Sequence, residues 1–559
     1  MDSIIPTGFR IGKNAVTNMK PRIVVARKVT TLDGDDAEAF VTVGDRIHAV
    51  GSISELRSRF VDADILDLGE AYIVPGFNDA HCHPSVTSET RLRLDVSPGA
   101  VQTLDELIAR VKDRAASVDD GEWVFAAGYN PNRMPKSDPK LTRDILDRIS
   151  KTKPIAIVLF NWHIAVVNTP ALELLKVDDH TPDPVGGEFG RDHAGRLDGW
   201  LFEQAFLNPY WSGTGWEPWV PDLSQDQLVA ALEKENEYLH STGITTYCDA
   251  IVTPRVWRTY EQARSAGRLT PRVGMLLWST FFDSAEELGI RSGFGDDHLR
   301  FIGVKTMYDG ALFGGTCLCK QSYPAGNGGE NGIQLVDKKD FGRLVQRVHD
   351  SGSRICVHAN GDRAVSEVID AIEIARYANP GVDINHRIEH CSMVDSGLLE
   401  RISAANITPV PFSGAIRQHG AQLVKFYGQQ RASEVAPHRK FLDAGITVGG
   451  SSDYPTTPVE PLLAIESMVT RTCALDGEVL GDDQRLSVRE ALWTYTVGSA
   501  AASGESHLKG RIRPGQLADF TVLDTDIVDR PEAIGTASVL QTWVGGSQVW
   551  NRPGQEVSI

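Results

Sequence analysis

The sequence lacks the features of a membrane, secreted or nucleic-acid-binding protein. It has no run of about 18 apolar residues, and Met1–Lys20 has no continuous apolar core of signal-peptide length. Basic residues are in the minority, because 56 Lys and Arg against 74 Asp and Glu give a formal net charge of −18. Nucleic acids and anionic membranes require basic patches. We therefore expect a soluble, cytoplasmic protein with no nucleic-acid or membrane partner.

Cysteine is also scarce. The seven cysteines are odd in number and have no repeating spacing, which is typical of reduced thiols and not of a disulfide framework. Cys317 and Cys319 form the only close pair, and we interpret them as two incidental thiols in a Gly-rich loop.

The composition, with 41% hydrophobic and 23% charged residues, is that of a globular protein. The length of 559 residues exceeds one ordinary core, so we expect a large domain with an accessory one. After a loose leader at 1–20, short β-like runs with turn signals occur near both ends of the chain. They lie at 22–26, 39–43, 46–50 and 63–68, and again at 517–523, 539–544 and 547–550. These runs predict a β-sandwich built from both termini.

Between these ends the pattern alternates strand and helix, which is typical of a parallel sheet covered by helices. The strand-like runs lie at 73–83, 244–249, 272–278, 301–307, 353–358, 382–390, 407–412 and 446–453. These eight runs predict an α/β fold with a (β/α)8 TIM-like barrel, and such barrels place their active sites at the carboxyl ends of the strands.

A long interval at about 85–225 separates the first two barrel strands. It contains β-like runs at 123–127 and 154–160 and a segment rich in Trp, Pro and Gly, typical of loops, between 181 and 221. We interpret it as an insertion that covers the site, since long irregular stretches are often functional. For the Trp-rich stretch Trp200–Trp219 we expect one of two roles: it lines a hydrophobic substrate pocket, or it forms the core of the covering loop. The predicted domains are 1–72 and 500–559 for the two halves of the sandwich, and 73–499 for the barrel.

The first barrel run ends in His81 and His83. On a strand, residues two apart face the same side, and their Cα atoms lie about 7 Å apart, close enough for both rings to bind one metal ion. A bare His-x-His is more often structural. However, ligand-type residues also lie on or at the ends of later runs: Lys305, His358, His390 and Asp453. Imidazole and carboxylate are ligands that zinc prefers, so we expect a divalent metal site, with zinc the expected ion.

Lys305 is unusual in this set because an ammonium has no acceptor. One interpretation is a salt bridge to Asp309 or Asp453. The other is carboxylation by carbon dioxide, which requires the neutral amine and yields an anionic carbamate that can bridge two ions. Burial beside a metal would lower the lysine pKa and favour carboxylation.

The motifs resemble those of the amidohydrolase superfamily, in its amidohydrolase-3 branch of YtcJ-like and N-substituted formamide deformylase-like enzymes. The matching stretches are Pro75–His83, His163–Asn168, Gly199–Glu203, Lys305–Gly310, His358–Ala364, Arg387–His390 and Gly450–Pro455. They cover nearly the whole chain, including both sandwich halves. Two positions depart from the usual pattern: Gly128-Tyr-Asn130 replaces Gly-Trp-Asp, and Asn360 replaces an aliphatic residue.

The resemblance implies roles for individual residues. His81 and His83 would bind one ion, His358 and His390 a second, and a carboxylated Lys305 would bridge the two. Asp453 would bind metal and act as the catalytic acid and base. His163, also a candidate catalytic residue, and Glu203 match positions that face substrate, and Tyr129 is a further candidate substrate contact.

These roles imply hydrolysis of a carbon–nitrogen bond, in an amide or N-substituted formamide, by metal-activated water. The partner would be a small-molecule substrate. Alternatives are a mononuclear deaminase or cyclic amidohydrolase with one ion and an unmodified Lys305, or a binding protein that has lost turnover. A homodimer is the commonest oligomeric state. We interpret Asp79 as steadying its strand or orienting a histidine, and Arg387 with Glu389 as a structural ion pair.

Overall fold

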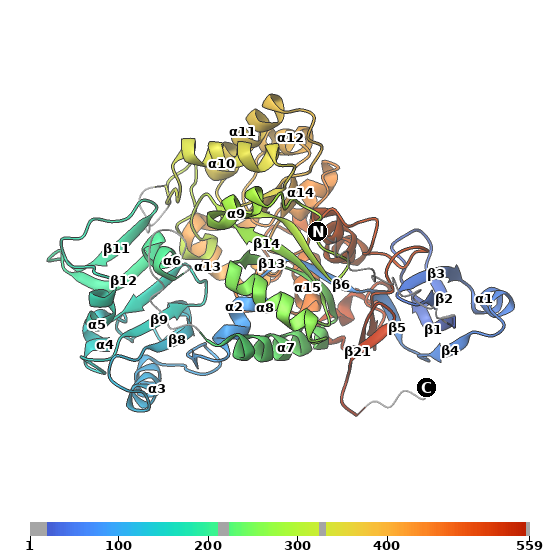
Figure 1. Cartoon of the computed structure of the whole chain (residues 1–559), viewed down its shortest axis with the longest axis horizontal. Helices are drawn as coiled ribbons and strands as arrows, with labels where there is room; N and C mark the ends of the chain where they lie inside the picture. Colours follow the sequence, from blue (N-terminus) through green and yellow to red (C-terminus); the bar gives the residue numbers. More distant parts are fainter. Residues whose placement is uncertain (1–19, 211–222, 324–330, 555–559) are drawn as a thin grey trace, which may run out of the picture.

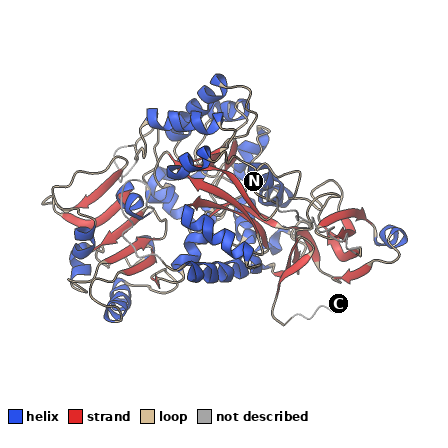
Figure 2. Cartoon of the chain, viewed as in Figure 1, coloured by secondary structure: helices blue, strands red, loops and turns tan. Residues whose placement is uncertain are grey.

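The computed structural model describes residues 20–210, 223–323 and 331–554. Three sheets dominate this part of the chain (Figure 2). The barrel sheet lies in the middle, the insertion sheet on one side of it, and the sheet of the two chain ends on the other (Figure 1). The expected leader lies outside the described residues, apart from Lys20.

The barrel sheet has seven parallel strands, in the order β18-β17-β16-β15-β14-β13-β6. Their runs of apolar and β-branched residues suit strands that are covered on both faces. All nine residues of β13, for example, are buried. The strands are β6 (Phe77–Cys82), β13 (Ile244–Val252), β14 (Arg272–Trp278), β15 (Leu299–Met307), β16 (Ile355–Ala359), β17 (Arg387–His390) and β18 (Thr408–Val410). The predicted TIM-like barrel is confirmed.

The eighth predicted strand, 446–453, is not a regular strand. It closes the barrel as an extended segment with scattered bonds: Gly449 N–H donates to Pro409 O at 3.1 Å, and Ala80 N–H donates to Gly450 O at 3.0 Å. Prolines at 409 and 411 cannot donate to a ladder. A Cβ on Gly450 would lie 2.5 Å from the Tyr495 ring, so this segment passes too close to its neighbour for a side chain.

The first predicted strand, 73–83, is two strands in two sheets. β5 (Tyr72–Pro75) belongs to the sheet of the chain ends, whereas β6 begins the barrel. Gly76 separates them, and a Cβ there would lie 2.3 Å from Thr245 Oγ1. A side chain at the point where the chain changes sheets would therefore collide with Thr245.

Helices cover the barrel, and several of them begin with a side-chain cap. Ser224 and Gln227 form a capping box on α7, and the Asp337 side chain accepts two backbone N–H groups of α10. In the described residues, no helix is both long and apolar enough to cross a membrane. The helices are α7 (Gln225–Ser241), α8 (Pro254–Ser265), α9 (Phe282–Glu287), α10 (Lys338–Asp350), α11 (Asp362–Ala378), α12 (Ser396–Ala404), α13 (Ala415–Ser433), α14 (His438–Asp443), α15 (Pro461–Thr470), α16 (Val488–Trp493) and α17 (Ser499–Ala502).

The insertion forms a six-stranded sheet over the carboxyl ends of the barrel strands, in the order β11-β12-β10-β9-β8-β7. One face packs on the barrel, since Phe125 and Val158 share a core with the barrel residues Ile251 and Met307. The other face packs on α3. The elements are α2 (Pro84–Thr90), β7 (Leu94–Asp95), α3 (Leu104–Ala116), β8 (Val124–Tyr129), α4 (Arg143–Asp147), β9 (Ile155–Leu159), β10 (Ile164–Val167), α5 (Thr169–Leu174), β11 (Gly187–Arg191), β12 (Leu197–Glu203) and α6 (Gln204–Tyr210).

Both runs predicted in the insertion are strands, β8 and β9. Trp200 lies on β12 and is buried. Trp211, Trp216 and Trp219 lie outside the described residues, so the alternatives for the Trp-rich stretch stay open.

Strands from the two chain ends join in one mixed sheet. The two termini thus build one β structure together, as the sequence predicts. β5 is its junction, because it pairs with β1 on one side and β19 on the other. A buried ion pair connects this sheet to the barrel: Arg272 Nε lies 2.7 Å from Asp519 Oδ2. The elements are β1 (Arg22–Val29), β2 (Ala37–Val43), β3 (Arg46–Gly51), α1 (Ile53–Arg59), β4 (Asp64–Asp67), β5, β19 (Phe520–Leu523), β20 (Val539–Val544) and β21 (Ser547–Asn551).

Candidate metal centre

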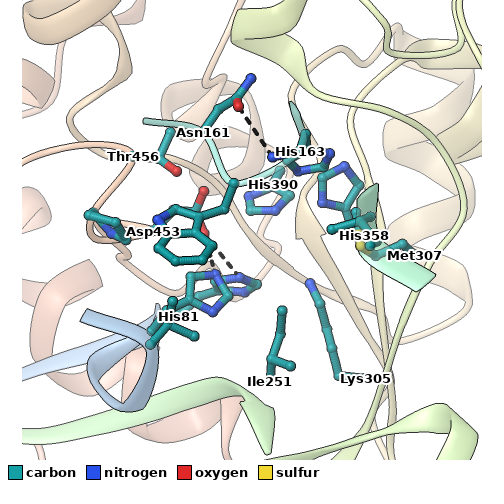
Figure 3. Close-up of a pocket in the computed structure, with 15 residues that line it drawn as sticks. His81, Asn161, His163, Ile251, Lys305, Met307, His358, His390, Asp453 and Thr456 are labelled. Atoms are coloured by element: carbon teal, nitrogen blue, oxygen red, sulfur yellow. Dashed lines mark hydrogen bonds and ion pairs between the residues drawn. The ribbon is translucent and has the colours of Figure 1, made fainter. Parts of the chain in front are cut away.

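A cavity at the carboxyl ends of the barrel strands brings most of the candidate residues together (Figure 3). Its free volume is about 40 Å³, room for a few waters or ions. Its lining includes His81, His83, Asn161, His163, Lys305, His358, His390, Asp453 and Thr456. Thus all six expected metal ligands, together with His163, border one cavity.

His81, His390 and Asp453 form the most compact group, with ligand atoms that all lie within 4.8 Å of one another. His83 is adjacent, since its Nε2 lies 3.0 Å from Asp453 Oδ1, the oxygen that lies 3.3 Å from His81 Nε2. Within the described part of the chain, three buried histidine ring nitrogens of this site have no hydrogen-bond partner: Nε2 of His81, Nδ1 of His83 and Nδ1 of His390. Unpaired buried nitrogens cost about 1–3 kcal/mol each. The donor set therefore fits a divalent cation.

Glu389 orients His81, a role that the sequence analysis did not assign. Nδ1 of His81 donates to the Glu389 carboxylate, which leaves Nε2 to face the cavity. Glu389 also pairs with Arg387, at 2.7 Å from Nε to Oε1. Burial alone would raise the pKa of Glu389, but Arg387 and His81 hold it well below its usual range. The predicted Arg387–Glu389 pair is thus present, and it also fixes the orientation of a candidate ligand.

His358 is held by the loop after β15. Its Nε2 donates to Gly310 O at 3.1 Å, which leaves Nδ1 as the nitrogen free to bind a metal. The side chain of Asn360 lies beside it and donates to the same carbonyl at 3.2 Å. Burial, with Lys305 and His163 nearby, lowers the pKa of His358 well below its usual value. The ring is therefore neutral at physiological pH, as a ligand must be.

Lys305 is buried, and its side chain points toward the cavity (Figure 3). Burial lowers the pKa of Lys305 to about 8, although Glu389 and Asp453 oppose the shift. The salt-bridge interpretation is wrong, because neither Asp309 nor Asp453 lies within 4.0 Å of its amine in the described structure. Asp309 instead accepts three backbone N–H groups, those of Leu318, Asn360 and Gly361.

Asp453 is positioned by the irregular closing segment. Its N–H donates to His81 O at 2.8 Å, and its backbone has φ +53°. His390 has φ +70°, so both residues have the left-handed conformation that often marks functional sites. Burial would raise the pKa of Asp453, but His390, His81 and His83 lower it well below its usual value.

Asp79 holds this segment in place and does not orient a histidine ring. It accepts the N–H and hydroxyl of Ser452 and the backbone N–H of His81. Burial raises the pKa of Asp79 to about 7. Of the two sequence interpretations, the steadying role is the one observed.

His163, which is partly exposed and directly precedes β10, pairs with the buried Glu203 at the end of β12. His163 Nδ1 donates to Glu203 Oε2 at 2.6 Å, and Thr316 Oγ1 donates to Glu203 Oε1 at 2.7 Å. Burial would lower the pKa of His163, but the Glu203 carboxylate raises it overall. Glu203 is fully buried behind the ring, so His163 borders the cavity and Glu203 does not.

Tyr129 is not brought into this cavity. It lines a separate cleft of about 640 Å³, with Trp200, His419 and Lys425. A third hollow shares Trp200 and Lys425 with that cleft and shares Asn161 with the metal cavity. The cleft around Tyr129 thus adjoins the third hollow, and the third hollow adjoins the candidate centre.

A parallel barrel with such side chains at the carboxyl ends of its strands has the architecture of a barrel enzyme. The chain belongs to the Amidohydrolase family, whose model matches residues 64–550. It is 29% identical to YtcJ of Bacillus subtilis (strain 168) over 93% of this chain and 97% of that protein. It is also 29% identical to N-substituted formamide deformylase of Arthrobacter pascens, over 96% of this chain and all of that protein.

Solved structures agree on the fold. A metal-dependent hydrolase from Pyrococcus horikoshii OT3 has a TM-score of 0.72 at 23% identity, covering 91% of this chain and 98% of its own. One from Pyrococcus furiosus has a TM-score of 0.70 at 24% identity, covering 91% of this chain and all of its own.

Proposed function

We propose that this protein is a metal-dependent hydrolase of a carbon–nitrogen bond in a small amide or N-substituted formamide. The observation that carries the proposal is the convergence of His81, His390 and Asp453 within 4.8 Å, in a cavity that Lys305 and His358 also border. The full-length similarity to an N-substituted formamide deformylase supports this bond type.

The residues that would hold the metal are His81, His83, His358, His390 and Asp453, with Lys305 as a carbamate if two ions bind. A bound zinc or similar ion supplies Lewis acidity and lowers the pKa of water to about 7. The pKa of Asp453 is lowered well below its usual value, and its carboxylate is hydrogen-bonded to His83. At neutral pH Asp453 is therefore ionised and can accept a proton from the attacking water. It then delivers that proton to the leaving nitrogen.

His163 is placed to donate from Nε2 to the oxygen that becomes negative as the carbonyl is attacked. Glu203 holds Nδ1 and favours the protonated ring, which makes it a stronger donor. We propose Glu203 as a positioning residue and Tyr129, in the separate cleft, as a contact for the distal part of the substrate.

A single-ion enzyme is the second candidate. The compact group contains only three ligand residues, and Lys305 has no ion-pair partner within 4.0 Å in the described structure, which suits one ion and a free amine. We further propose that 1–72 with 500–559, and 73–499 with its insertion, act as the domain units of a cytoplasmic enzyme that forms a homodimer.

The test is metal content and turnover together. Protein purified without chelator should contain about one or two zinc-like ions per chain and hydrolyse members of an amide and formamide panel. Asp453→Asn should lower turnover at least ~10³-fold with the fold intact. Asp113→Asn, an exposed carboxylate on α3, is the matched control and should behave as wild type. Near-normal turnover of Asp453→Asn would overturn the mechanism.

A further inference from the structure

Three sulfur atoms gather in a buried pocket beside the loop that follows β15. Cys317 and Cys319 are two residues apart on a segment without regular secondary structure, and both pack in one apolar cluster, while Leu318 packs into the barrel core. Their Sγ atoms are 3.8 Å apart, and Cys319 Sγ lies 3.9 Å from Met393 Sδ. Both thiols are free and fully buried.

These separations are those of ligands around one soft metal ion. At a metal–sulfur distance of about 2.3 Å, sulfurs 3.8 and 3.9 Å apart subtend angles of about 110° and 115°, between tetrahedral and trigonal geometry. A disulfide would instead require the two Sγ atoms to approach to about 2.05 Å. Thiolates with a thioether favour Cu(I) over the harder divalent ions.

Polar groups border these sulfurs. The Tyr323 and Tyr427 hydroxyls lie 3.2 and 3.3 Å from Cys317 Sγ, and the Arg431 guanidinium lies 3.9 Å from Met393 Sδ. The hydrogen bond with Cys317, followed by the charge of Arg431, lowers the pKa of the Cys319 thiol, whereas burial raises the pKa of the Cys317 thiol. A bound cation would therefore have to displace the proton of Cys317. A hollow of about 240 Å³ is lined by Met393 and Arg431, so it reaches the thioether side of the sulfur group.

We propose that Cys317, Cys319 and Met393 form a binding site for a thiophilic monovalent cation, Cu(I) in chemical class. On binding, two sulfur–metal bonds form from the cysteines and one from the thioether, and the thiol protons leave to solvent. The site shares no residue with the candidate metal centre. It does adjoin it through Thr316, whose hydroxyl donates to Glu203.

The probe is Cu(I), titrated anaerobically into the full chain in competition with a chromophoric Cu(I) chelator, after thiol counting has established that both cysteines are reduced. We expect one equivalent to be held by wild type and lost in Cys317→Ser and in Cys319→Ser. Met393→Leu conserves volume and should weaken retention about tenfold while the protein stays folded. Cys473→Ser is the matched control, because this thiol is likewise free and buried but lies on a different segment of the chain.

Equal Cu(I) retention by wild type and the two serine variants would overturn the proposal, as would retention unaffected by Met393→Leu. The measurement needs no substrate. Its failure would therefore leave the proposed hydrolase untouched, and an inactive enzyme that still holds Cu(I) would leave this site standing.

Discussion

The carboxylate of Glu389 accepts a hydrogen bond from Nδ1 of His81, which lines the cavity, and both side chains are fully buried. This bond fixes the tautomer of a candidate ligand from a residue five strands away along the sheet order.

Replacing Glu389 should therefore weaken metal binding without removing a ligand. We expect Glu389→Gln to lower zinc affinity about 10–100-fold, measured by competition with a chelator. The variant also leaves the buried Arg387 unpaired, which costs about 3–5 kcal/mol of stability, so folding must be checked by thermal unfolding. Glu373→Gln, which removes a partner of Arg401 on the surface, is the control. Unchanged zinc affinity in a folded Glu389→Gln would contradict the role of this bond.

The His163–Glu203 dyad predicts a loss of rate that is separable from metal binding. Glu203→Gln removes the charge that raises the pKa of His163, and we expect kcat/KM to fall about 10²-fold with unchanged metal per chain. The pH profile should shift as well, because the protonated ring is less favoured. A loss of metal in this variant would show instead that Glu203 acts through the ligands.

Gly76 predicts a steric effect on stability. In Gly76→Ala the new methyl would lie 2.3 Å from Thr245 Oγ1, and such overpacking costs about 1–3 kcal/mol. The thermal unfolding midpoint should fall and should recover in part in the double variant Gly76→Ala, Thr245→Ala, which removes the two nearest atoms and leaves Cβ of residue 245 at 2.9 Å. Gly381→Ala, where the nearest atom is 3.7 Å away, is the control. A normal midpoint in Gly76→Ala alone would contradict the close approach.

The buried His240 should make the folded protein less stable at low pH. It donates from Nδ1 to Ile244 O at 2.9 Å, and burial lowers the pKa of His240 to about 4. The unfolded chain binds a proton near pH 6.5 and the folded chain only near pH 4. This histidine therefore adds no penalty above pH 6.5 and costs about 1.4 kcal/mol for each pH unit below it, until about pH 4.

His240→Asn keeps a donor to Ile244 O but does not titrate. Its unfolding midpoint should fall less steeply than that of wild type between pH 6.5 and 4. The exposed His193→Asn should keep the wild-type slope. Parallel curves for wild type and His240→Asn would contradict this assignment.

Much of the barrel and its candidate site could be predicted from the sequence because the signals are local. Alternation of strand and helix predicts a parallel barrel, and period two places His81 and His83 together at a strand end. Once the strands are parallel, their carboxyl ends meet, so Lys305, His358, His390 and Asp453 converge without any knowledge of packing.

Tertiary structure decided the features that depend on contacts between distant segments. The split of 73–83 at Gly76 follows from the approach of Thr245, and the irregular closing segment from Tyr495 and the prolines of its neighbour. The Glu389–His81 bond, the burial of Glu203 behind His163, and the placement of Tyr129 in another cleft likewise arise only when the barrel closes and the insertion packs on it. Side-chain partners across such distances depend on the sheet register and on packing, which no local pattern specifies.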